Sequence, residues 1–314
     1  MIGSEPPLDL KVESSSPSTS RRPQAAARGR WAGWLYVLPA LVMYALFVLW
    51  PLFTSVEYSL YDWNGITTGR WVGLGNYRSV LTDSELLLPI VHSFELVFFF
   101  TVIPVCLGLV AAALIRGFSQ GGFGAVARTI LFLPQVAPLV AAGIAWKWAY
   151  SETGVVNQLL SAVGLSGLTR PWLADFGTAL PAVGIIGAWV LLGFCTVLLL
   201  TGMSKIDPSL YEAARIDGAG PIQEFRAITV PSLIGEIGVC VTVSMIAALS
   251  SFDIIYISTY GGPGRVTMVP GVLIYRLAFD ERKVGLASAM AVVLMILVVG
   301  CVLIVQRAMK GEDA

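Results

Sequence analysis

The sequence is short of charge and almost without histidine. Charged residues make up 13% of its 314 positions, and His92 is the single histidine. Soluble domains carry about 25% charged residues, so this composition indicates that lipid is the main solvent. One histidine excludes a histidine-rich metal site. The formal net charge of zero leaves no overall field that would attract nucleic acid.

The cysteines offer no metal-binding or redox pattern. None belongs to a Cys-x-x-Cys spacing, and all four lie in apolar runs, at Cys106, Cys195, Cys240 and Cys301. We therefore expect buried thiols that pack between helices, in place of disulfides or metal ligands. No constellation of histidine, cysteine or paired carboxylates is present, which argues against a membrane enzyme.

A phosphate-binding loop is missing as well. The glycine-rich turn at 261–264 is not followed by Lys and Ser or Thr, and no glycine in the chain is directly followed by lysine. That lysine is needed to reach the phosphates of a nucleotide. The chain should bind neither ATP nor another cofactor.

What the sequence has in quantity is long apolar runs. It is 56% hydrophobic, with a mean hydropathy of +0.77. About 20 mainly apolar residues cross the hydrocarbon core as a helix. Six runs qualify, and they predict an all-α polytopic membrane protein with spans at Trp34–Ser55, Ile90–Ile115, Arg128–Trp148, Ala179–Thr201, Leu233–Ile257 and Val284–Gln306. The third contains Pro134 and Pro138.

The basic residues favour one orientation. With the N-terminus inside, the inner segments hold twelve of the 20 Lys and Arg residues and the outer segments hold eight. The cluster Arg21, Arg22, Arg28 and Arg30 precedes the first span. Cytoplasmic segments are enriched in such residues, so both termini are predicted to be cytoplasmic.

The N-terminal segment precedes the predicted membrane domain at 31–310. Residues 1–30 are rich in Ser, Pro and Arg, which predicts a disordered cytoplasmic tail. A cleaved signal peptide is the alternative. The following apolar run is too long for a signal, and no small-x-small cleavage site follows it promptly, so an uncleaved span is favoured.

A polar insert, Glu212–Pro231, separates the fourth span from the fifth. Asp207 is placed to cap a helix whose first residue is Pro208, and Gly218 can supply the left-handed conformation that ends it. Gly220 and Pro221 then begin a second short helix. An amphipathic linker lying on lipid is the alternative, but it would need bulky apolar residues and more Lys or Arg. Alanines and mixed charges favour a protein partner.

The spacing of this insert resembles the EAA loop of ATP-binding-cassette (ABC) importer permeases. The matching positions are Glu212-Ala213-Ala214, Gly218, Ile228 and Pro231, with Val230 where leucine is usual. In that family the loop, here 204–231, forms a coupling helix that docks on the ATPase. The resemblance therefore implies a coupling role for Glu212, Ala213, Ala214 and Gly218, with Arg215 and Asp217 as neighbours at the interface. A solvated helix end remains the alternative for Asp217.

Two further stretches narrow the resemblance. The segment Ser251–Met290, which includes Gly261-Gly262-Pro263, is similar to the C-terminal region of carbohydrate-importer permeases. The segment from Leu38 to Leu81 resembles the MalF/UgpA-like subunit of the permease pair. This implies a type I, MetI-like fold and import of a sugar, oligosaccharide or polyol by alternating access. The implied partners are a second permease subunit, an ABC ATPase dimer and an extracytoplasmic solute-binding protein.

The helices on either side of the EAA loop line the cargo path in the family. Carried over by distance from Glu212, the resemblance implies a path at Val190, Leu191, Phe194, Ser244, Ala248 and Ser251. An aromatic and an acid of the same two spans, Trp189 and Asp253, are added as candidates. Ordinary helix packing is the alternative for the aromatics. Solvation at the membrane interface is the alternative for Asp253.

Two other transport classes stay open at this point. An ABC importer for a non-sugar solute shares the EAA loop, although the C-terminal segment argues against it. A stand-alone secondary transporter should show charges within its spans or broken repeat helices at mid-depth, whereas the acids here, such as Glu95 and Glu236, lie near span ends.

Overall fold

The computed structural model describes residues 29–117 and 122–310. The predicted tail at 1–30 thus lies almost wholly outside the described residues. The chain forms two compact units that divide between Leu52 and Phe53. The described part of the first unit is one helical run, made of α1 (Gly29–Tyr44), a π-helical turn (Ala45–Leu49) and the start of α2 (Trp50–Tyr58). Tyr36–Tyr58 is long and apolar enough to cross a membrane, in line with the first predicted span.

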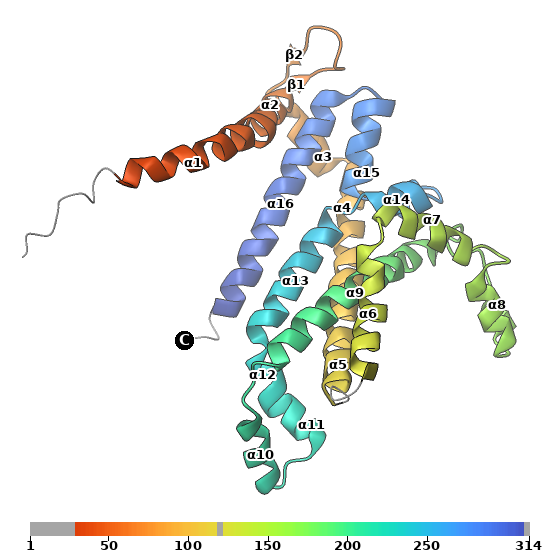
Figure 1. Cartoon of the computed structure of the whole chain (residues 1–314). Coiled ribbons are helices and arrows are strands. Elements are labelled where there is room, and N and C mark those ends of the chain that lie inside the picture. The colour runs from red at the N-terminus through yellow and green to blue at the C-terminus, as the bar shows by residue number, and fades with distance from the viewer. Residues whose placement is uncertain (1–28, 118–121, 311–314) are drawn as a thin grey trace, which may run out of the picture. The chain divides into compact units, whose positions relative to one another are not determined.

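The second unit is almost entirely helical (Figure 1). Its elements before the polar insert are β1 (Tyr61–Asp62), β2 (Arg70–Trp71), α3 (Gly75–Thr82), α4 (Ser84–Val97), the π-helical η2 (Phe98–Val102), α5 (Ile103–Gly117), α6 (Gly122–Val136), α7 (Leu139–Ala149), α8 (Val155–Ala162), η3 (Ser166–Leu168) and α9 (Ala179–Met203). β1 and β2 pair antiparallel, with Tyr61 opposite Trp71.

The elements from the insert onward complete the unit. They are α10 (Pro208–Ile216), α11 (Pro221–Glu224), the π-helical η4 (Phe225–Thr229), α12 (Val230–Ser232), α13 (Ile234–Leu249), α14 (Asp253–Ser258), α15 (Pro270–Tyr275), the π-helical η5 (Arg276–Asp280) and α16 (Val284–Lys310). The all-α prediction is confirmed for the described residues, apart from the two-residue strands.

Two predicted spans are not the straight helices that their hydropathy suggested. Within the described residues, four helical segments are long and apolar enough to cross a membrane, and six are counted if each bent pair is one span. The third prediction, Arg128–Trp148, is wrong as a single helix because the chain bends by 100° between Val136 and Leu139. The fifth, Leu233–Ile257, ends at Leu249, and α14 is a separate helix.

Proline accounts for the break in the third span. Pro138 adopts an extended ψ of 134° directly before α7. A proline has no N–H to continue the helical ladder and disfavours helical backbone at the residue before it, here Ala137. Pro134 lies within α6 without breaking it. Of the two prolines that the sequence singles out, only Pro138 breaks the helix, and the direction and size of the bend depend on the helices around it.

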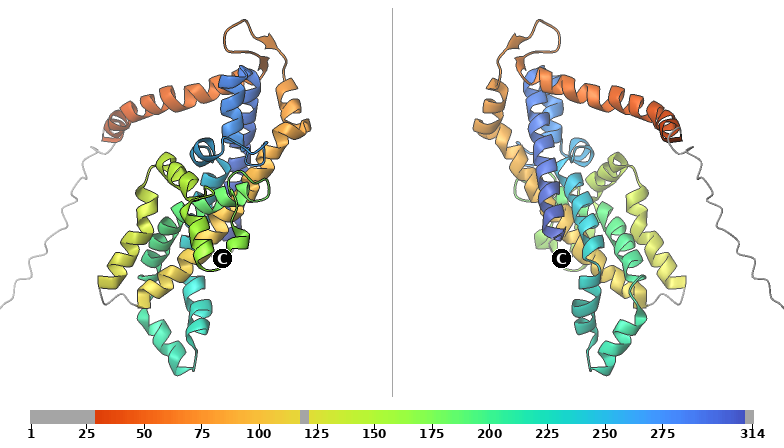
Figure 2. Two further views of the ribbon diagram at one scale, coloured as in Figure 1. Left: turned by 90° about the vertical axis from the view of Figure 1, so that its right-hand side faces the viewer. Right: turned by 90° about the vertical axis from the view of Figure 1, so that its left-hand side faces the viewer.

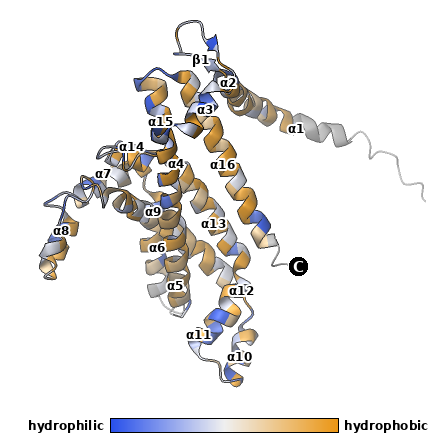
Figure 3. Cartoon of the chain, turned by 180° about the vertical axis from the view of Figure 1, so that it is seen from behind, coloured by the Kyte–Doolittle hydropathy of each residue, from blue (hydrophilic) through white to orange (hydrophobic). Residues whose placement is uncertain are grey.

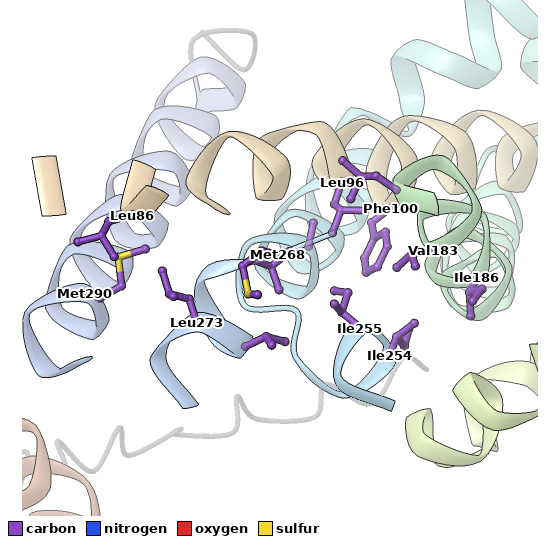
Figure 4. Close-up of a cluster of buried hydrophobic side chains, with 14 of the residues drawn as sticks. Leu86, Leu96, Phe100, Val183, Ile186, Ile254, Ile255, Met268, Leu273 and Met290 are labelled. Carbon is purple, nitrogen blue, oxygen red and sulfur yellow. The ribbon is translucent and has the colours of Figure 1, made fainter. Parts of the chain in front are cut away.

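The larger of two buried clusters holds the helices together around α9. Side chains from α4, η2, α9, α14 and α15 meet there, as the close-up of Leu96, Phe100, Val183, Ile254 and Leu273 shows (Figure 4). Glycines permit the close approach. A Cβ built on Gly187 would lie 2.0 Å from the Phe100 ring, and one on Gly193 would lie 2.1 Å from the Leu131 carbonyl oxygen. Small residues at such crossings are typical of helix packing in membranes.

The second unit has two distinct ends. The α10 and α11 hairpin projects at one end, and β1, β2 and α15 lie at the other (Figure 2). Colouring by hydropathy shows that α5, α9 and α13 are mainly hydrophobic, whereas hydrophilic residues appear on α11 and α10 (Figure 3). The polar insert predicted from sequence is therefore a structured projection beyond the apolar bundle.

Candidate functional site: a polar hairpin and a cavity between broken helices

The polar hairpin, residues 207–232, begins as its sequence predicted. The Asp207 carboxylate accepts a hydrogen bond of 2.9 Å from the Ser209 N–H, and Pro208 is the first helical residue. Hydrogen bonds to Ser209 stabilise the charged carboxylate and lower the pKa of Asp207. The helix ends at Ile216, and Gly218 has a φ of +82°, the left-handed conformation expected after a helix end. The local helix–turn–helix prediction is confirmed.

The tip of the hairpin is open surface. A Cβ at Gly218 or Gly220 would meet no heavy atom within 4 Å. Three large apolar side chains of the hairpin are exposed, Leu210 by 51%, Ile216 by 86% and Ile222 by 74%, and the last two lie near the tip. The predicted coupling residues lie on or next to this tip; all are exposed except half-buried Ala214, and they are Glu212, Ala213, Arg215, Asp217 and Gly218. Apolar and charged groups together are available there to a partner.

An ion pair closes the hairpin on its inner side. The Arg215 guanidinium donates to both carboxylate oxygens of Glu224, at 2.8 and 3.3 Å. The hydrogen bond with Glu224, and then its negative charge, raise the pKa of Arg215. Glu224 is only 9% exposed. Sequence analysis placed Arg215 at an interface and did not identify Glu224, because no short-range pattern announces this pairing of residues nine apart across a turn.

A second group of contacts joins the hairpin to the bundle. The Arg116 guanidinium at the end of α5 donates to the Tyr211 hydroxyl at 2.7 Å and lies 4.5 Å from the centre of the Tyr211 ring. The Tyr211 hydroxyl also lies 2.9 Å from Thr229 Oγ1. These groups border a cleft of about 490 Å³ between the hairpin and the bundle. Tyr211 thus connects α5, α10 and η4, a role that the sequence did not reveal.

The return path into the bundle contains a widened helical turn. In η4 the Val230 N–H donates to the carbonyl of Phe225, five residues back. Pro231 follows, and its ring would crowd the carbonyl four residues earlier in an ordinary helix. The wider turn accommodates this proline. The helix then bends by 69° between Ser232 and Ile234 on entering α13.

A cavity of about 320 Å³ lies where the broken helices meet. It is bordered by the end of α6, the start of α7, the middle of α9 and the α13–α14 turn. Four of the predicted path residues line it, namely Val190, Leu191, Ser251 and Asp253. Asp253 opens α14 and is half-buried at the cavity, so it does not lie near the end of one long fifth span as expected.

The other four predicted path residues lie elsewhere. Trp189 is 38% exposed and meets Trp146 edge to face, with ring centres 5.5 Å apart. Phe194 packs against a second buried cluster. Ser244 and Ala248 are fully buried within the chain, and the Ser244 hydroxyl donates to the Cys240 carbonyl at 2.7 Å. The structure therefore does not bring these four to the cavity.

The cavity also contains a polar residue that sequence analysis missed. Gln135, in the last turn of α6, lines the cavity, and its Oε1 is buried without a hydrogen-bond partner among the described residues. Leaving such a group unsatisfied costs about 1–3 kcal/mol. The available signal was a lone amide in the apolar stretch Leu133–Pro138. Together with Ser250, Ser251 and Asp253, it gives a mainly apolar cavity hydrogen-bonding capacity.

Within the described residues, no group of three or more His, Cys, Asp or Glu side chains is placed to hold a metal ion. A bundle of membrane-spanning helices, a hydrogen-bonded polar hairpin at one end and a cavity between broken helices are the features of the membrane component of a transporter. The chain belongs to the family described as "Binding-protein-dependent transport system inner membrane component", whose profile matches residues 65–310. It is thus a multi-pass inner-membrane permease of an ABC importer with a MetI-like fold, and ATP hydrolysis belongs to a separate subunit.

Individual relatives support this family assignment. The chain is 35% identical over 279 residues to the probable ABC transporter permease protein YurN of Bacillus subtilis (strain 168), which covers 88% of this chain and 95% of the relative. It is 33% identical over 251 residues to the lactose transport system permease protein LacF of Rhizobium radiobacter, covering 79% and 83%. A crystal structure of a bacterial ABC transporter that imports alginate resembles its fold, with a TM-score of 0.76 at 22% identity, covering 90% of this chain and 96% of that one.

Proposed function

We propose that this permease carries a carbohydrate across the membrane by alternating access, with the polar hairpin as the site at which a separate ATPase drives it. The observation that carries the coupling role is the hairpin itself, which is held rigidly on its inner side and exposed at its tip. The carbohydrate assignment draws on the C-terminal segment, Ser251–Met290, and on the lactose permease among the relatives.

Two features suit the hairpin to transmit force. Arg215 and Glu224 fasten its two helices to each other, and Tyr211 fastens it to Arg116 and Thr229. A push on the tip is therefore passed to α5 and to the helix that enters α13. ATP can drive such a movement only if the ATPase binds one arrangement of the assembly better than another. The coupling residues are Glu212, Ala213, Ala214, Arg215, Asp217 and Gly218, now with Tyr211 and Glu224 as positioning residues.

The cavity is the proposed contact with cargo. Sugars need hydrogen-bond donors and acceptors in a setting otherwise lined by apolar groups. Gln135, Ser251 and Asp253 supply them, and Val190 and Leu191 supply apolar wall. Gln135 lies just before the break between α6 and α7. The two helices that flank the EAA loop, α9 and α13, contain no amide side chain of their own.

The orientation and the assembly follow from this proposal. If the hairpin meets the ATPase, its end of the bundle is cytoplasmic, and the basic cluster before the first span agrees with a cytoplasmic N-terminus. Residues 1–30 would then be a cytoplasmic tail and 31–310 the permease domain. The complete importer would contain a second permease subunit, two ATPase subunits and an extracytoplasmic binding protein.

The coupling role is tested by Gly218→Pro in the reconstituted importer. Proline cannot adopt the φ of +82° found at Gly218, so the hairpin tip must change shape. We expect an inserted and assembled complex whose ATP hydrolysis no longer responds to the loaded binding protein. Gly164→Pro is the matched control, because Gly164 has a φ of +83° after α8 and also faces open space. Normal stimulation in Gly218→Pro would refute the coupling role.

A further inference from the structure

Five aromatic rings from α14, α15 and the residues that flank them form a continuous strip. The backbone of α15 lies at the end of the second unit opposite the hairpin (Figure 1). Neighbouring ring centres are 4.9 Å apart for Phe252 and Tyr256, 5.1 Å for Tyr256 and Tyr260, 5.0 Å for Tyr256 and Tyr275, and 5.0 Å for Tyr275 and Phe279. We call these residues the aromatic strip. Phe252, Tyr256 and Tyr260 follow one another at four-residue intervals along α14 and its flanks, whereas Tyr275 and Phe279 come from α15 and η5, so a single helix does not explain the arrangement.

The aromatic strip begins at the cavity and ends in the open. Phe252 lines the cavity beside Ser251 and Asp253. At the other end Phe279 is 71% exposed. Phe252, Tyr256 and Tyr275 are half-buried, and Tyr260 is exposed. Every ring thus keeps accessible surface, which residues serving only the core would not need.

Charged groups along the strip indicate that it faces water. The Tyr260 hydroxyl donates to Asp280 Oδ2 at 2.6 Å, and the Arg276 guanidinium lies 5.8 Å from the Tyr260 ring centre. The hydrogen bond with the Asp280 carboxylate raises the pKa of Tyr260 to about 12. A charged residue in the hydrocarbon costs about 2.5–3.5 kcal/mol. A lipid-facing position would not be expected to gather Arg276 and Asp280 beside exposed rings.

The backbone is shaped to bring the strip together. A Cβ at Gly271 would lie 2.9 Å from the Ser251 carbonyl oxygen, so glycine lets α15 approach the α13–α14 turn closely. Tyr275 consequently reaches both Phe252 and Tyr256, with ring centres 5.8 and 5.0 Å away. The π-helical η5 then carries Phe279 onward from Tyr275. Such π-helical segments occur often at functional sites.

We propose that the aromatic strip is a binding track for the pyranose rings of an oligosaccharide, leading from the outer surface to the cavity. This rests on the proposed function. The C–H face of a sugar ring is weakly positive and stacks on the negative face of an aromatic ring. Tyrosine hydroxyls, Arg276 and Asp280 are positioned to exchange hydrogen bonds with sugar hydroxyls. Because the strip continues over five rings, it favours a chain of sugars over a single small polyol.

The test uses the complete importer in proteoliposomes with its binding protein. The probes are labelled lactose, maltose and cellobiose, and the tetrasaccharides of the maltose and cellobiose series. Tyr256→Leu and Phe279→Leu each remove one ring, and Tyr256→Phe keeps it. Tyr58→Leu is the matched control, because Tyr58 pairs with Trp63 at the same end but outside the strip.

We expect each ring removal to reduce uptake of the transported sugar roughly two- to tenfold, the size of an aromatic contact. The loss should be larger for the tetrasaccharide than for the disaccharide, and Tyr256→Phe should restore uptake. The control should transport as the wild type does. Unchanged uptake in both leucine variants would refute the role of the aromatic strip as a binding track, but it would not contradict carbohydrate import.

Two other outcomes also count against the strip. If the leucine variants fail to assemble with the second permease subunit while Tyr58→Leu assembles, the strip is a subunit interface. If no sugar of the panel is taken up by the wild-type importer, carbohydrate import itself fails and the strip fails with it. A loss of equal size for every sugar length would indicate a structural role and overturn the track.

Discussion

The polar hairpin is formed by residues close together in the sequence, whereas the cavity and the aromatic strip are formed by residues from distant segments. In the polar hairpin, the helix cap, the turn and the Arg215–Glu224 pair all lie within 26 residues of chain, 207–232. The cavity, which lies within the bundle, instead joins Gln135, Val190 and Ser251, and three different helix breaks or crossings must be correct before it exists. The hairpin is therefore a local structure that projects from the bundle, whereas the cavity and the aromatic strip are products of the whole fold.

This contrast predicts which changes act at one end only. A variant in the hairpin should uncouple ATP hydrolysis from cargo without changing which cargo is accepted. A variant in the cavity or the strip should change transport of particular cargo while the hairpin still responds to the ATPase. Four variants would break or sharpen this separation.

The largest effect is expected for Tyr211→Ala. The variant loses the hydrogen bond from Arg116, the contact with Thr229 and the ring below the guanidinium. These contacts are worth about 2 kcal/mol together, which corresponds to a roughly 30-fold shift in an equilibrium. Cargo-stimulated ATP hydrolysis should fall by up to that factor. Tyr211→Phe keeps the ring and should lose less. Wild-type activity of Tyr211→Ala would show that the hydroxyl and ring do not position the hairpin, and an equal loss in both variants would assign the effect to the hydroxyl alone.

The same contrast explains what sequence could predict. The caps at Asp207 and Gly218 and the EAA spacing depend on neighbouring residues, so the hairpin and its exposed tip were predicted correctly. Gln135 and Glu224 were not identified, because their importance comes from partners, or a missing partner, that only the folded chain defines. For the same reason sequence could not tell that four of the predicted path residues line the cavity, whereas Trp189, Phe194, Ser244 and Ala248 are not brought to it.

Gln135→Leu, in the cavity, should raise the stability of the protein and lower its transport activity. Replacing the unpartnered amide removes a buried polar group whose cost is about 1–3 kcal/mol, so the midpoint of thermal unfolding of the complex should rise. Uptake of cargo should fall roughly tenfold, because the cavity loses its amide. The measurements are unfolding in nanodiscs and uptake in proteoliposomes. Lower stability together with normal uptake would mean that Gln135 is a packing residue and not a cargo contact.

Glu224→Gln should have a smaller effect, confined to the hairpin. The amide can still accept one hydrogen bond from Arg215, but the charge that holds the pair is gone. We expect a several-fold loss of cargo-stimulated ATP hydrolysis with the ranking of cargo sugars unchanged. Lys205→Gln, which removes a more exposed pair with Glu236, is the matched control and should change little. A changed order of preferred sugars would show that the two ends are not separable.

The smallest effect is expected for Asp207→Asn. The pKa of Asp207 is lowered in the folded hairpin by hydrogen bonds from Ser209, so its contribution to stability is present above the unfolded pKa, about 3.9. That contribution is lost only as the pH falls through the lower, folded value. The Asp207 carboxylate therefore stays charged between pH 5 and pH 8, and its titration should not change coupling over that range. Asparagine is also a good helix cap, so wild type and variant should show the same ratio of stimulated to basal ATP hydrolysis across that range. A ratio that diverges between them near neutral pH would mean that the ATPase senses the charge at Asp207, and that the start of α10 belongs to the contact surface together with the tip.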